Sequence, residues 1–127
     1  MNYENVVDIF FSRFPDMRSL LSEFESESLP YIAFGGLMSH IIELIRNSGK
    51  NDEKIKLLFE FFEEMATCEI SEVRELLMYA ILEMLGDYKD VLKTADSYMG
   101  KETWKLSRAV EKFHGRAEFD IRDWETD

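Results

Sequence analysis

Cysteine, proline and histidine are scarce in this chain of 127 residues, which contains one Cys, two Pro and two His. A single cysteine excludes an intramolecular disulfide framework and fits a reducing compartment. No apolar run has the length needed to span a bilayer. Residues 1–14 include Glu4 and Asp8, where a signal peptide would be apolar. We therefore predict a cytoplasmic protein.

Positive charge is also scarce: 15 Lys and Arg side chains stand against 26 Asp and Glu, and the net charge is −11. Binding to nucleic acid depends on Lys and Arg that neutralise phosphates, and anionic membranes likewise attract basic proteins. The sequence therefore argues against nucleic acid and membrane as partners. Residues 51–100 carry most of the acidic excess, with 12 acidic and 5 basic side chains. Such a field would attract a basic protein, although acidic surfaces also serve solubility alone.

Residues that could hold a metal ion or a cofactor form no complete motif. Glu111 and His114 have the Glu-x-x-His spacing that places two ligands on one helical face. A di-iron site needs a second such motif and Glu from two further helices, and His40 does not supply it. His114 precedes Gly115 and is more simply explained as a residue at a helix end. We predict no metal site and no cofactor.

Two further features resemble chemical motifs but have simpler explanations. The Gly35–Gly36 pair follows no strand and lacks the lysine of a phosphate-binding loop, so it favours close packing of helices. Cys68 has no base near it in the sequence and is expected to be a buried thiol. We predict no catalytic residue, and hence a protein that is not an enzyme.

Apolar residues at helical spacing predict a central helix over residues 71–85. Ser71 suits the N-cap of this helix, and Gly86 suits a left-handed residue that ends it. Further apolar residues lie beside the main stripe, so the helix is expected to be covered on more than one side. The apolar stripe consists of Val73, Leu76, Leu77, Ala80, Ile81 and Met84.

The same spacing predicts helices in most of the remaining chain. Their expected ranges are 2–13, 15–25, 31–47, 52–67, 87–99 and 101–114. The last of them is expected to bury Leu106, Ala109, Val110 and Phe113. Short connections favour antiparallel neighbours, so we predict an all-α domain of six to seven helices over residues 1–115, with helical hairpins stacked as in a bundle or a solenoid. The tail, residues 116–127, either docks on this domain or stays loose.

Polar side chains form one narrow line on the central helix. Carboxylates of the preceding helix could extend this line into an acidic binding face; the alternative is a solvated surface with one carboxylate held by an arginine or a helix end. Trp104 lies opposite the apolar stripe of the last helix, and is either an interface anchor or a partner of Trp124 in the tail. The predicted partner-binding residues are Glu60, Glu63, Glu64, Glu72, Glu75, Tyr79, Glu83 and Trp104.

Several short segments resemble a family of small, all-helical bacterial immunity proteins, which are encoded beside polymorphic or contact-dependent toxins. The resemblance covers about residues 30–115, and Glu83 is a recurring position in it without an assigned role. It implies a protein that binds one cognate toxin and blocks it, for example by covering the basic groove of a nuclease with an acidic face. The alternative is a helical adaptor or regulatory subunit. The segments that carry the resemblance are 62–65, 71–73, 81–86, 99–104 and 113–115.

Overall fold

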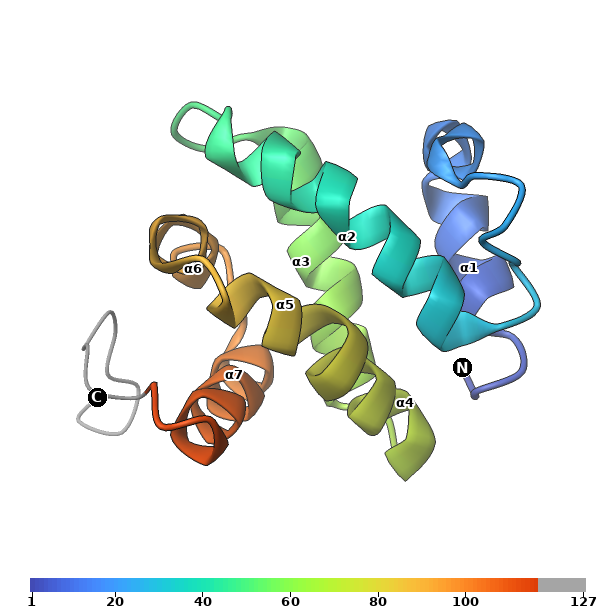
Figure 1. Ribbon diagram of the computed structural model, residues 1–127. Coiled ribbons are helices and arrows are strands. Elements are labelled where there is room, and N and C mark those ends of the chain that lie inside the picture. Colours follow the sequence, from blue (N-terminus) through green and yellow to red (C-terminus); the bar gives the residue numbers. More distant parts are fainter. Residues whose placement is uncertain (117–127) are drawn as a thin grey trace.

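Every regular element in residues 1–116, the part of the chain that the computed structural model describes, is a helix (Figure 1). The predicted all-α class is therefore confirmed. In chain order the elements are α1 (Val6–Arg13), the 3-10 helix η1 (Pro15–Leu20), α2 (Pro30–Arg46), α3 (Glu53–Ala66), α4 (Ser71–Leu76), the π-helix η2 (Leu77–Leu82), α5 (Glu83–Gly86), α6 (Lys89–Asp96) and α7 (Lys101–Phe113).

Helix ends follow signals that the sequence contains. Pro30 occupies the first turn of α2, where its missing N–H is not needed. Asp52 caps α3, because its carboxylate accepts a hydrogen bond from the backbone N–H of Ile55 at 3.0 Å. Gly115 adopts a left-handed conformation with φ of 69°, and it follows His114, the C-cap of α7.

The predicted central helix is present as one continuous run, α4–η2–α5, but its middle and its ends differ from the prediction. Ile70, not Ser71, is the N-cap, and Gly86 lies inside α5 rather than in a left-handed turn. Residues 77–82 form a π-helix, whose i→i+5 hydrogen bonds enclose more residues per turn. Ala80, Ile81 and Leu82 are consecutive and all buried, so this segment is covered on more than one side, as predicted.

The α4–η2–α5 run lies between the two halves of the molecule. Its π segment packs on α2, α3 and α7, and α5 packs on α6 and α7. Figure 1 shows α2 and the α4–α5 run in front of α3, with α6 and α7 on the left and α1 on the right. Ser71, Glu72, Glu75 and Tyr79 of the run stay exposed.

An aromatic cluster fills the core between α1, α2 and α3. The Phe10 ring has no exposed surface. It contacts the rings of Phe11, Phe14, Phe34 and Phe61 at centroid distances of 5.5, 4.9, 5.2 and 5.2 Å. Phenylalanine therefore joins the N-terminal helix to the rest of the domain by edge-to-face and tilted contacts.

The segment after η1 differs from the sequence prediction. The helix expected over 15–25 stops at Leu20. Beyond it, the Glu25 carboxylate accepts a hydrogen bond from the backbone N–H of Ser22 at 2.8 Å, which lowers the pKa of Glu25. The same carboxylate lies against Gly36, where a Cβ would overlap it. The prediction that the Gly pair permits helix packing was wrong, because a loop side chain fills that space.

Candidate functional site

The buried face of α7 matches the prediction only in part: Val110 is buried and Leu106 is half-buried against the core. Phe113 is 85% exposed and Ala109 is also exposed, whereas Trp104 is only 6% exposed. The prediction of Trp104 as a surface anchor was therefore wrong, and Trp124, its alternative partner, lies outside the described residues. The buried residues of α7 are Thr103, Trp104, Ser107, Val110 and Glu111.

The prediction from hydrophobicity failed because two of the polar residues on that buried face have hydrogen-bond partners, one on α3 and one in the turn after α7. Thr103 binds the Glu63 carboxylate, and Glu111, 1% exposed, binds Arg116. A buried polar group is tolerated when it is hydrogen-bonded. Sorting the α7 residues by hydrophobicity alone therefore assigned the polar side to solvent and Phe113 to the core.

Glu63 caps the start of α7 from the neighbouring helix α3. Its carboxylate accepts hydrogen bonds from the backbone N–H of Glu102 at 3.1 Å and of Thr103 at 2.8 Å, and from the Thr103 hydroxyl at 2.7 Å. A negative charge is favourable at a helix N-terminus. A Cβ on Gly100 would lie 2.5 Å from Cδ of Glu63, so glycine makes room for this contact. Glu63 is thus engaged inside the protein, contrary to its predicted place in a binding face.

Replacing Glu63 with alanine is expected to lower the free energy of unfolding by about 2 kcal/mol, because three hydrogen bonds to a carboxylate and a helix cap are lost together. Glu63→Gln should lose less, since its amide oxygen can still accept. Urea denaturation of both variants measures the difference. In Gly100→Ala the new Cβ would push the Glu63 carboxylate away from the start of α7, so this variant should also be less stable than the wild-type chain. A stable Glu63→Ala variant would contradict the role of the cap.

The other two α3 carboxylates also lie apart from the predicted polar line. Glu64 forms an ion pair with Arg13 of α1, and the hydrogen bond from Arg13 lowers the pKa of Glu64. Glu60 is exposed and lines a groove with Lys56, residues 48–51, Thr94, Ser97 and Tyr98. Glu63 lies at the start of α7, and Glu83 lies beside its end. These two carboxylates are therefore separated by about the length of α7, which has 13 residues and is about 20 Å long at 1.5 Å per residue. The predicted acidic face is therefore divided.

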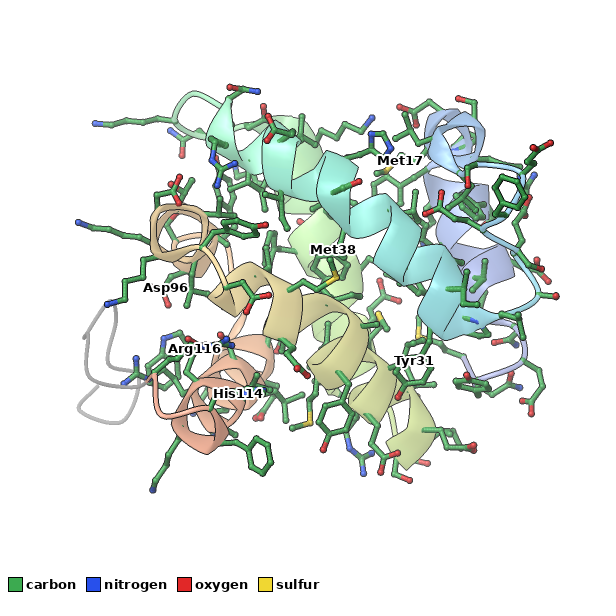
Figure 2. The ribbon with its side chains drawn as sticks, viewed as in Figure 1. Met17, Tyr31, Met38, Asp96, His114 and Arg116 are labelled. Atoms are coloured by element: carbon green, nitrogen blue, oxygen red, sulfur yellow. The ribbon has the colours of Figure 1, made fainter. Side chains whose placement is uncertain are left out.

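The polar line of the central helix lies on a surface that also carries aromatic side chains. Tyr79 is 52% exposed and Tyr31 is 41% exposed. Burial raises the pKa of Tyr31, and Tyr3, Glu75 and Tyr79 near it add to this shift. In Figure 2, Tyr31 and His114 flank the α4–η2 run on opposite sides. We call this region the acidic-aromatic surface, and it consists of Tyr31, Glu72, Glu75, Met78, Tyr79, Glu83, Phe113 and His114.

A small apolar hollow of about 180 Å³ lies between η2 and α7 within this surface. Val110, 3% exposed, belongs to its lining, and the Phe113 ring meets the His114 ring edge-on at 5.2 Å. His114 Nε2 lies 3.3 Å from Oε1 of Glu83 beside the hollow. Glu83 is thus a half-exposed edge residue and not an internal carboxylate. The lining residues are Met78, Tyr79, Ala109, Val110, Phe113 and His114.

Exposed aromatic side chains around an apolar hollow are typical of interaction sites, and π-helical turns often occur at functional sites. The sequence prediction contained Tyr79, Glu72, Glu75 and Glu83 of this surface but missed Tyr31, Met78, Phe113 and His114. A signal for Phe113 exists: it is the last residue of its helix, directly before His114-Gly115. A side chain in the last turn often has no helix facing it.

The residues considered for metal chemistry are engaged elsewhere. Glu111 faces Arg116 and His114 faces Glu83, so the Glu-x-x-His pair does not converge. Across residues 1–116, no group of three or more His, Cys, Asp and Glu is placed to hold a metal ion. Cys68 is half-buried, and its thiol donates to the carbonyl of Met1 at 3.4 Å. In the same part of the chain, no helix has the length and apolar character to cross a membrane.

These features define an all-helical protein with an exposed acidic-aromatic surface. The chain belongs to the family described as a domain of unknown function (DUF7674), whose sequence profile matches residues 7–115. A search of curated proteins and a search of solved structures find no match. The matched region begins at the second residue of α1 and ends at Gly115 after α7, and therefore contains every residue of the acidic-aromatic surface.

Proposed function

We propose that this protein is a non-enzymatic binding protein that holds a basic partner protein on its acidic-aromatic surface. The observation that carries the proposal is Phe113, a large apolar side chain that is 85% exposed beside an apolar hollow. A single exposed ring is ordinary, but Phe113 adjoins Met78 and Tyr79 around the hollow, and contiguous exposed apolar patches mark interaction sites. The carboxylates of Glu72, Glu75 and Glu83 on the same surface favour a partner of opposite charge.

The class of partner that we propose is a toxin, with this protein acting as its cytoplasmic, bacterial immunity protein. The resemblance of residues 30–115 to immunity proteins and the net charge of −11 support this proposal. A toxin that cleaves nucleic acid needs a basic groove, which an acidic surface can cover. A gene for a basic toxin directly beside the gene for this chain would favour the immunity role. Its absence would favour a helical adaptor instead.

Exchanging Glu72, Glu75 and Glu83 for lysine together is expected to weaken partner binding by at least about 100-fold, because three attractive charge pairs become repulsive. The tagged full chain is purified from its native cells, and the co-purifying protein is identified and produced. Isothermal titration calorimetry then compares its affinity for the wild-type chain and the triple variant. Circular dichroism checks that helicity is retained.

The matched control exchanges three exposed glutamates elsewhere for lysine, Glu23, Glu43 and Glu53. This control changes the net charge by the same amount, so it separates the surface from the overall charge. Binding should be largely kept in the control. Equal loss in both variants, or no loss in the first, would contradict the assignment of this surface to partner binding.

A further inference from the structure

We infer that the hollow between η2 and α7 is a socket for one large apolar side chain of a basic partner segment, with Lys or Arg residues of that segment facing Glu75 and Glu83. The inference rests on the proposed function and specifies the part of the partner that it recognises. It follows from the size of the hollow, the composition of its walls and the placement of charge around it.

The size of the hollow matches one side chain. Its volume is about 180 Å³, and an apolar protein cavity of about 150 Å³ accommodates benzene. A Phe, Leu or Met side chain therefore fits, whereas a second large side chain does not. Val110 forms a buried floor, and Met78 is a half-buried and flexible wall. Thioether side chains adapt to different apolar groups, so the socket accepts shape variation but requires an apolar occupant.

Charge is distributed unequally around the socket. Glu83 lies beside it, with its carboxylate 3.3 Å from His114, and Glu75 precedes Tyr79 of the lining by one helical turn. On α7, Lys105 and Lys112 are the i−4 and i+3 neighbours of Ala109 in the lining, so the basic side chains border the α7 side of the socket. Carboxylates therefore border the η2 side of the socket, and a segment that enters from this side gains from positive charge.

The same charges argue against two other occupants. Residues 117–127 of this chain carry five acidic side chains and one basic side chain, so the tail would be repelled by Glu75 and Glu83. A second copy of the chain carries a net charge of −11, so self-association through this surface would bring like charges together. A separate basic segment avoids both penalties.

The test uses the full chain with ¹³C-labelled methionine methyl groups, which report on the socket through Met78. The probe is the peptide Lys-Arg-Phe-Arg-Lys, blocked at both ends. It should shift the Met78 methyl resonance, while the buried Met17 and Met38 should not respond. Replacing the peptide Phe by Ala should weaken binding at least about tenfold, since the burial of an aromatic ring is lost. Exchanging the peptide Lys and Arg for Glu should abolish the shift.

A variant that fills the socket tests the site from the protein side. Ala109→Trp places a ring in the hollow from its exposed wall, and should weaken the Phe peptide at least about tenfold. Lys93→Trp adds the same ring on the exposed side of α6, a helix that does not line the hollow, and is the matched control. Equal affinity for the Phe and Ala peptides, or equal loss in both Trp variants, would overturn the inference.

Two measurements identify the rejected occupants. A Met78 resonance that changes with protein concentration in the absence of peptide would indicate a second copy in the socket. A resonance that moves when Phe119 and Trp124 are replaced by alanine would indicate the tail. Either result overturns the inference. With the full-length partner, loss of binding by the Glu→Lys triple variant but not by Ala109→Trp would refute the socket and leave the proposed function standing.

Discussion

Replacing Phe10 with alanine is expected to lower the free energy of unfolding by about 3–5 kcal/mol. Its ring is fully buried and contacts four other phenylalanine rings from α1, α2 and α3. Truncation removes the burial of the ring and leaves a cavity that rigid neighbouring rings cannot close. A domain of this size has a total stability of about 5–15 kcal/mol, so the variant should lose a large fraction of it. Urea denaturation followed by circular dichroism measures the loss.

Two controls show whether the loss comes from the aromatic cluster. Phe10→Leu keeps most of the apolar volume and should cost clearly less than the alanine variant. Phe24→Ala removes the same ring from a site that is 83% exposed, and should change stability by less than about 0.5 kcal/mol. If Phe10→Ala were as stable as Phe24→Ala, the cluster would not be what joins α1 to the domain.

Replacing Arg116 with alanine is expected to cost about 3 kcal/mol, because it leaves a buried carboxylate without its counter-charge. Arg116 donates to both carboxylate oxygens of Glu111, from Nε at 3.1 Å and from Nη2 at 2.9 Å. Glu111 is 1% exposed, whereas the Arg116 side chain is 25% exposed, so we place the loss at the lower end of the range for buried pairs. The hydrogen bond to Glu111 raises the pKa of Arg116. Urea denaturation again gives the free energy.

The local geometry explains why this arginine reaches its partner. Gly115 turns the chain with a positive φ, so that the backbone N–H of Arg116 donates to the Glu111 carbonyl at 2.7 Å and that of Gly115 to the Lys112 carbonyl at 3.1 Å. This pair of bonds is the Schellman arrangement of a helix end. A Cβ on Gly86 would overlap the Glu111 carboxylate, so α5 comes close enough for the pair only with glycine there.

Two further variants test the arginine contact. Arg116→Lys keeps the charge but cannot form the two-point contact, and should lose part of the stability. Exchanging Glu111 and Arg116 together for methionine removes the buried charge and should recover most of the loss. A double variant as unstable as Arg116→Ala would show that the loss has another cause than an unpaired carboxylate.

The helices could be predicted from the sequence because apolar spacing is a local property. The run from residue 71, α2 after Pro30 and the end of α7 at Gly115 all lie close to where the pattern placed them. The line formed by Glu72, Glu75 and Tyr79 could be predicted for the same reason, because it also follows from helical spacing. The 3-10 helix η1 ended early because Glu25 interacts with Ser22 and Gly36, and the Gly36 contact is between segments that the pattern treats separately.

What the sequence by itself determined is the all-α class, the approximate helix limits and the excess of negative charge. Only the tertiary structure decided which side of α7 is buried and which carboxylates are available to a partner. The reason is that Glu63 of α3 satisfies Thr103, and Arg116 in the turn after α7 satisfies Glu111. These partners allow polar residues of α7 to be buried, while Phe113 stays exposed. The hydrophobic periodicity of one helix contains neither partner, so it could not predict which side of α7 is exposed.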